Sequence, residues 1–137
     1  MIIGVGVDVV EVGRMERVLR TPYARRFLQR IFSADEIDVC EATARPAQSY
    51  AARFAAKEAV SKALGTGFTR GVTPGAIVVE GGERERPMVA LKDRALEVAR
   101  AQRVSRIHLS LTHTGETACA FVVAENADLT GKSPQTI

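Results

Sequence analysis

The stretch from Ala47 to Leu64 constrains the fold more than any other, because it is the longest helical pattern in this chain of 137 residues. Alanine has the highest helix propensity, and Gly65 follows where a helix commonly ends. At 100° per residue, small and aliphatic side chains fill one half of the circumference. We therefore predict a long helix that packs closely on a sheet. The residues of the apolar half are Ala52, Ala55, Ala56, Ala59, Val60, Ala63 and Leu64.

Strand patterns lie on both sides of this helix in the sequence. Residues 2–10 alternate Ile and Val with Gly4, Gly6 and Asp8, which predicts a strand with the glycines on one face. Those glycines leave room for another backbone or a ligand. Strands at both ends with helices between them predict an α+β fold, with an antiparallel sheet packed on the long helix. Further strands are predicted at 76–80, 88–91, 106–112 and 117–124, the last two joined by residues 113–116.

Four shorter helices are predicted from periodicity and capping signals. Residues 11–19 follow a helical pattern, a Thr-Pro pair interrupts it, and residues 23–32 resume it. Ser33 followed by Glu36 is a capping box, which predicts a helix running to about residue 44. Residues 92–103 form an amphipathic pattern.

Length and composition favour one globular unit. With 46% hydrophobic and 26% charged residues, the chain can bury a core. We expect a domain over residues 1–125 and a polar tail over 126–137. Cys40 and Cys119 are too few for a disulfide framework, the apolar start lacks the basic region of a signal peptide, and no run approaches a membrane span. These features together predict a cytoplasmic protein.

Positive charge is gathered between residues 14 and 30. This segment contains six arginines and one acidic residue, Glu16, so its net charge is +5, whereas the formal net charge of the whole chain is +3. Such a segment favours an acidic partner. A nucleic-acid-binding module is the competing interpretation, but the arginines lack the interleaved aromatic residues of a stacking surface.

Two carboxylates stand out. Asp8 lies on an apolar strand, where burial without a partner would cost several kcal/mol. It needs a counter-charge, or it lies near the end of the strand and caps the next helix. Glu58 is either a solvated partner of Lys62 at i,i+4 or part of a polar stripe with Phe54 and Ser61, next to a glycine-rich loop. Both interpretations remain open for each residue.

The second interpretation of Glu58 has a chemical consequence. Mg²⁺ often takes one or two protein carboxylates and completes its shell with water and substrate phosphates. Asp8 and Glu58 would suffice, with Lys57 and Lys62 holding phosphates as point charges. His113, in a predicted turn, is a weak signal alone. The glycine-rich stretches match neither a dinucleotide fingerprint nor a P-loop.

Three separated segments together resemble one family. They are GVGVDVVEVGR at 4–14, RFAAKEAVSKALGTG at 53–67 and HLSLTHTGETA at 108–118. They are similar to holo-[acyl-carrier-protein] synthase, the small phosphopantetheinyl transferase of bacterial fatty-acid synthesis. The resemblance covers roughly residues 1–125. It implies an α+β fold assembled as a homotrimer, with active sites between neighbouring subunits.

The resemblance also implies roles for individual residues. Asp8 and Glu58 match the magnesium ligands of the family. His113 matches a histidine that helps form the coenzyme A site across a subunit boundary. Lys62 matches a residue that contacts the coenzyme A phosphates, and the residues expected beside it are Arg53, Gly65, Thr66 and Gly67.

The docking surface for an acidic carrier protein is implied in the same way. Its residues are Arg14, Arg25, Arg26, Phe27 and Phe54. The chain departs from the family at two places. The first helical region is about two residues longer around Thr21-Pro22, and Thr117 stands where the family often has an aromatic residue.

The activity implied is Mg²⁺-dependent transfer of 4′-phosphopantetheine from coenzyme A to a serine of apo acyl carrier protein, in fatty acid biosynthesis. Adenosine 3′,5′-bisphosphate is the second product. Lys62 would assist the leaving phosphate, and the serine proton would go to Glu58 or to a metal-ordered water. We prefer the water, because a carboxylate bound to Mg²⁺ is a poor base. A carrier from a polyketide or peptide synthase is an open alternative. No membrane or nucleic-acid partner is expected.

Overall fold

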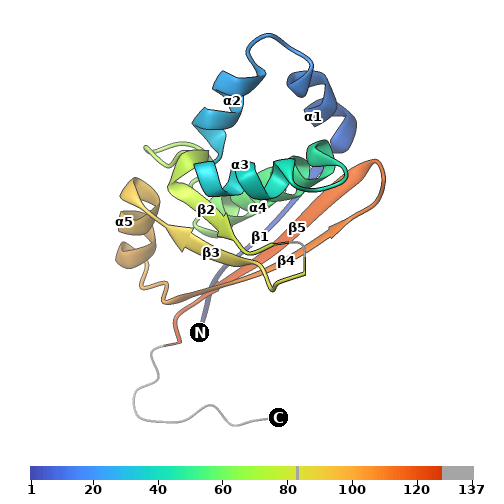
Figure 1. Cartoon of the computed structure of the whole chain (residues 1–137). Coiled ribbons are helices and arrows are strands. Elements are labelled where there is room, and N and C mark those ends of the chain that lie inside the picture. Colours follow the sequence, from blue (N-terminus) through green and yellow to red (C-terminus); the bar gives the residue numbers. More distant parts are fainter. Residues whose placement is uncertain (83, 128–137) are drawn as a thin grey trace.

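The computed structural model describes residues 1–82 and 84–127. Helices and strands follow one another in the order that the sequence predicts, and the α+β class is confirmed (Figure 1). The elements are β1 (Ile2–Glu11), α1 (Val12–Leu19), α2 (Ala24–Ile31), α3 (Ala34–Glu41), α4 (Pro46–Ala63), the 3₁₀ turn η1 (Pro74–Ala76), β2 (Ile77–Glu80), β3 (Met88–Leu91), α5 (Asp93–Ala101), β4 (Arg106–His113) and β5 (Thr117–Glu125).

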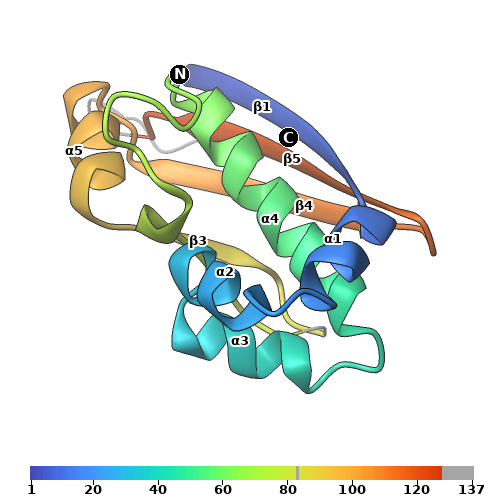
Figure 2. The ribbon, with the colours of Figure 1, turned by 90° about the horizontal axis from the view of Figure 1, so that it is seen from above.

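The strands form two antiparallel sheets. One has the order β1-β5-β4, so β1 and β4 are its edges, and the other is the β2–β3 hairpin. In the larger sheet Ala120 of β5 is opposite Asp8 on one side and Leu111 on the other. Helix α4 runs along this sheet, with β1 on one side of the helix and the β2–β3 hairpin on the other (Figure 2). The two flanks of α4 are therefore different environments.

Strand β1 lies directly on α4. A Cβ atom at Gly6 would stand 1.8 Å from the backbone oxygen of Ala59, and one at Gly4 would stand 1.9 Å from that of Ala63. No side chain fits at that distance. The prediction that these glycines admit another backbone is confirmed. Because Asp8 lies on the same face of β1, the close approach also brings its carboxylate to α4.

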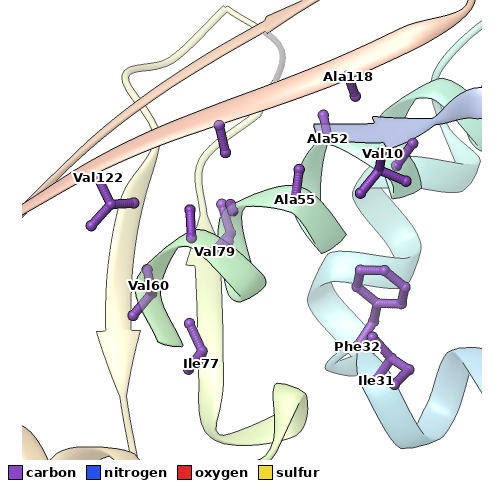
Figure 3. Packing of buried hydrophobic residues seen from close by; sticks show 14 of the residues in the cluster. Val10, Ile31, Phe32, Ala52, Ala55, Val60, Ile77, Val79, Ala118 and Val122 are labelled. Atoms are coloured by element: carbon purple, nitrogen blue, oxygen red, sulfur yellow. The ribbon is translucent and has the colours of Figure 1, made fainter. Parts of the chain in front are cut away.

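The core between α4 and the sheet consists of small side chains. All seven residues predicted for the apolar half of α4 are buried. They meet the inward residues of β5, among them Ala118 and Val122 (Figure 3). Lys57 and Ser61, on the opposite half of the helix, are also buried. Periodicity identified this half as polar, but η1 and β2 cover part of it.

The other face of the larger sheet carries exposed apolar side chains. Val5, Val7 and Val9 of β1 point away from α4 and are 52–60% exposed, and Phe121 of β5 lies opposite Val7. Contiguous exposed apolar surface marks an interaction site more often than a chance arrangement. This face is therefore a candidate contact surface.

Local signals placed several element boundaries. The capping box of α3 is confirmed, since Ser33 Oγ accepts from the Glu36 amide at 3.1 Å and Glu36 Oε1 accepts from the Ser33 amide at 3.0 Å.

Only the first two residues of the predicted tail are described. The Ala127 amide donates to Ser105 Oγ, and residues 128–137 lie outside the described residues. Among the described helices, none combines the length and apolar character that crossing a bilayer requires.

Candidate active site

Asp8, Glu58 and Lys62 come together between β1 and the second half of α4. Glu58 and Lys62 are one helical turn apart on α4. Lys62 Nζ donates to Asp8 Oδ1 at 3.0 Å and to the backbone oxygen of Val7 at 3.1 Å. The ion pair joins residues 54 positions apart in the chain. The structure therefore confirms the counter-charge interpretation of Asp8.

The alternative interpretations fail. Helix α1 begins after Glu11, and within the described part of the chain no side chain caps it, so Asp8 is not a helix cap. Lys62, proposed as the solvated partner of Glu58, forms its ion pair with Asp8. Glu58 is thus a carboxylate beside a second carboxylate, on a helix face that α1 and β1 border.

The electrostatics of the two carboxylates indicate a cation site. Burial raises the pKa of Glu58, and the neighbouring Asp8 carboxylate raises that pKa further, while Lys62 and Arg14 oppose the rise. Asp8 Oδ2 is buried and has no hydrogen-bond partner among residues 1–82 and 84–127. An unsatisfied buried acceptor costs about 1–3 kcal/mol or more. Two adjacent carboxylates with a free oxygen fit a divalent cation that takes its other ligands from water and substrate, because no third acidic, His or Cys residue of the described chain joins them.

Lys62 and the turn that follows α4 provide anion-binding groups. The Lys62 side chain is 51% exposed, and its hydrogen bond with Asp8 raises the pKa of its ammonium, which therefore stays charged. Gly65 and Gly67 adopt φ values of 79° and 56°, which glycine tolerates best. Among the described residues, no atom lies within 4 Å of a Cβ built at either glycine. An incoming group can therefore approach this backbone closely.

A second cluster lies on the opposite flank of α4. A cavity of about 730 Å³ opens between the first turns of α4, the end of β4 and the connection after β2. Two predicted site residues, Arg53 and His113, line it. Three other cationic side chains line it that were not predicted from the sequence, those of Arg45, Arg84 and Arg86. Arg84 and Arg86 lie between the predicted strands 76–80 and 88–91, and two basic residues beside Gly81 and Gly82 are the signal that could have identified them.

The two clusters do not meet within one chain. Asp8 lies on β1 and His113 on β4, which are opposite edges of the sheet with β5 between them. Arg53 and Lys62 are nine residues apart on α4, which places them on opposite sides of the helix and about 13 Å apart along its axis. The prediction that Arg53 lies beside Lys62 is therefore wrong within one chain, and each flank holds only part of the predicted site.

Lys57 has a different role from the predicted one. Its side chain is fully buried, and its Nζ donates to Glu36 Oε1 at 2.9 Å and to the backbone oxygens of Pro74 and Ile77. It cannot reach a phosphate in solvent, so the prediction that both lysines hold phosphates is wrong for Lys57. The next residue, Glu58, faces the carboxylate site instead.

The predicted docking residues occupy the α1–α2 region and the adjoining side of α4. Arg14, Arg25 and Arg26 are exposed, whereas Phe27 and Phe54 are half-buried and pack against the core. Arg14 is close enough to Glu58 to favour its ionised form. A basic surface thus adjoins the carboxylate site on the β1 flank.

Similarity to known proteins identifies the class of enzyme to which this chain belongs. A family model described as the 4′-phosphopantetheinyl transferase superfamily matches residues 4–122. The chain belongs to this superfamily and is a phosphopantetheinyl transferase.

Within the superfamily, the chain falls among the holo-[acyl-carrier-protein] synthases. It is 50% identical to that synthase of Anaeromyxobacter dehalogenans, over 93% of this chain and 98% of the relative. The crystal structure of the Neisseria meningitidis synthase matches with a TM-score of 0.80 at 34% identity, over 91% of this chain and 99% of that one. The Bacillus anthracis synthase, in complex with coenzyme A (3′,5′-ADP), matches with a TM-score of 0.74 at 34% identity, over 93% and 99%.

Proposed function

We propose that this chain transfers 4′-phosphopantetheine from coenzyme A to a serine of apo acyl carrier protein and releases adenosine 3′,5′-bisphosphate. One observation carries the proposal. The free, buried Oδ2 of Asp8 lies beside the Glu58 carboxylate and the charged, exposed Lys62. A divalent cation and a phosphate fit this arrangement together. The coenzyme A complex of the Bacillus anthracis relative supports the choice of substrate.

Asp8 and Glu58 would hold Mg²⁺, which when bound neutralises charge on the coenzyme A pyrophosphate. The serine oxygen forms a bond to the phosphorus nearest pantetheine, and the bond from that phosphorus to the bridging oxygen breaks. The serine proton passes to a water beside the carboxylates. Lys62 remains charged and stabilises the phosphate that leaves with the nucleotide. Positioning and charge neutralisation thus provide most of the catalysis.

The active site is completed by a neighbouring subunit in this proposal. The carboxylate cluster lies at the β1 edge and the cavity with Arg53 and His113 at the β4 edge. We infer a homotrimer in which each β1 edge faces the β4 edge of the next copy, so that the cavity receives the rest of coenzyme A. The exposed apolar face formed by Val5, Val7, Val9 and Phe121 supports contact between copies.

The carrier would dock on the basic surface beside the carboxylates. Its residues are those expected from the sequence, Arg14, Arg25, Arg26, Phe27 and Phe54. The exposed arginines complement an acidic protein. We place this activity in the cytoplasm and in fatty acid biosynthesis, with residues 1–125 as the transferase domain and 126–137 as its tail.

Mass spectrometry tests the proposal directly. An apo acyl carrier protein incubated with the enzyme should gain the mass of one phosphopantetheine, and the gain should require both coenzyme A and Mg²⁺. Chelation of the metal should abolish it. The competing nucleic-acid module predicts no mass change, together with metal-independent DNA binding whose affinity falls steeply with salt. That pair of results would overturn the proposal.

Reversing charge on the basic surface should separate carrier binding from coenzyme A binding. Arg26→Glu is expected to raise KM for the carrier by about tenfold while KM for coenzyme A stays within about twofold, because rim charges act on the encounter of two proteins. Arg14→Glu should act in the same direction, but Arg14 also interacts with Glu58. Steady-state kinetics measure both constants. Arg100→Glu, at an exposed position of α5, is the matched control, and an equal rise of both KM values in the Arg26 variant would contradict this assignment.

A further inference from the structure

We propose that Glu36, Arg53 and Lys57 are positioning residues for the coenzyme A cavity, which they serve by holding the β2–β3 hairpin in place. The inference rests on the proposed function. Lys57 and Glu36 do not line the cavity, so they act through backbone that does. Arg53 lines the cavity and also donates hydrogen bonds to backbone oxygens of Val79 and Gly81 in the cavity wall.

The three side chains bind one edge of β2. The Val79 amide donates to Glu36 Oε2 at 3.1 Å, and Lys57 Nζ donates to the Ile77 oxygen. Arg53 donates from Nη1 to the Val79 oxygen and from Nη2 to the Gly81 oxygen. In a larger sheet, a neighbouring strand would bond to the backbone groups on this edge of β2. Here side chains form those hydrogen bonds instead.

These contacts add to the packing of Ile77 and Val79 in the core and of β3 beside β4, which together define the position of the hairpin. Each of its strands has four residues, and an isolated two-stranded hairpin is marginal in water. Val79 and Gly81, whose oxygens Arg53 holds, belong to the cavity lining, and Arg84 and Arg86 follow them in the same connection. A shift of β2 would therefore displace the arginines of the cavity wall.

Glu36 and Lys57 form a buried ion pair, and Arg53 places a second positive charge near Lys57. Glu36 is 1% exposed, Lys57 0% and Arg53 6%. Glu36 Oε1 accepts from both Lys57 Nζ at 2.9 Å and the Ser33 amide, so the α3 cap is part of the same network. Lys57 Nζ also lies 5.3 Å from the centre of the Phe32 ring. Removing one charge alone would leave another buried without its partner.

The test therefore removes both charges together. In Glu36→Leu/Lys57→Met, apolar side chains replace both members of the buried ion pair, so neither of the two charges is left without the other. We expect KM for coenzyme A to rise about tenfold or more, because a displacement of about 1 Å at a binding group costs this much. The thermal unfolding temperature should fall by several degrees, because the Val79 amide and the Pro74 and Ile77 oxygens lose their side-chain partners. The kcat should stay within about threefold. Lys92→Met, at an exposed lysine, is the matched control.

Hydrogen exchange provides a readout that does not depend on activity. The amide of Val79 should lose protection in the double variant, while amides of α4 and β1 keep theirs. If the double variant fails to fold, Glu36→Gln/Lys57→Gln removes both charges but keeps polar groups beside β2, and it tests the same contacts through the Val79 amide and KM. Unchanged KM for coenzyme A in a folded variant that has lost Val79 protection would overturn the inference. Absence of transfer by the unmodified enzyme would instead overturn the proposed function.

Discussion

Replacing Gly6 by alanine is expected to destabilise the protein by about 3 kcal/mol or more, or to prevent folding. The new Cβ would meet the backbone oxygen of Ala59 at 1.8 Å and the Ala59 carbonyl carbon at 2.8 Å. Both atoms belong to the middle of α4, which cannot yield as the end of a flexible side chain can. Strand β1 would have to move away from the helix and open the alanine-rich core. Denaturant unfolding measures the loss of free energy.

Gly13→Ala is the matched control for this substitution. Gly13 lies in α1, and the nearest atom to its added Cβ is the flexible end of Arg17 at 3.8 Å. Alanine is favoured over glycine in a helix by up to about 1 kcal/mol, so this variant should be as stable as the parent or more so. A loss below about 1 kcal/mol for Gly6→Ala would contradict the packing described for β1 on α4.

Glu58→Gln is expected to reduce transfer by about 10³-fold or more, because it removes one of two carboxylates proposed to hold the metal, and metal coordination contributes several kcal/mol to charge stabilisation. Mass spectrometry of the carrier gives the rate, and calorimetry gives the Mg²⁺ affinity, which should fall in parallel. Glu97→Gln, in an exposed pair with Arg94 on α5, is the control. Transfer within tenfold of the parent rate would refute the assignment of Glu58.

The same substitution, Glu58→Gln, should not lower the free energy of unfolding, although it lowers the rate of transfer. The pKa of Glu58 is raised in the folded protein by burial and by Asp8, so the folded state holds the proton more tightly than the unfolded state does. As pH rises from the ordinary carboxyl pKa through this raised value, ionisation of Glu58 lowers the free energy of unfolding. At neutral pH, Glu58→Gln removes that unfavourable charge. The inactive variant should therefore unfold at the same denaturant concentration as the parent or at a higher one.

Sequence patterns predicted the elements better than their contacts. The alternation in β1 and the alanine face of α4 depend on local periodicity, and both are confirmed. Lys57 was misassigned because periodicity marks a residue as polar but does not reveal what covers it. Its partners, Glu36 and Ile77, are 21 and 20 residues away along the chain. Glu36 was identified as a capping residue, and its second carboxylate contact, with Val79, depends on tertiary structure.

The candidate site was predictable to a similar extent. The apolar strand and the polar stripe of the helix identified Asp8 and Glu58 as candidates, the resemblance implied their role, and the structure shows that Lys62 provides the counter-charge of Asp8. The cavity arginines were missed, since Arg84 and Arg86 join Arg45 only when the hairpin packs beside β4. His113 was predicted in a turn and is the last residue of β4. The two clusters of site residues lie on opposite flanks because of the order of the strands in the sheet. Strand order depends on tertiary structure, so local sequence patterns do not predict it.

The carboxylate cluster at the β1 edge and the cavity at the β4 edge are two half-sites of one proposed active site. Their position at opposite edges of one sheet limits how copies of the chain can be arranged. A contact between the β1 edge of one copy and the β4 edge of the next joins two unlike surfaces. An open row built from such contacts leaves an unmatched half-site at each end, whereas a closed ring leaves none. In the ring that we propose, every chain contributes to two catalytic centres, and there are as many complete centres as chains. A single helix, α4, then serves two centres at once, with Glu58 in one and Arg53 in the other.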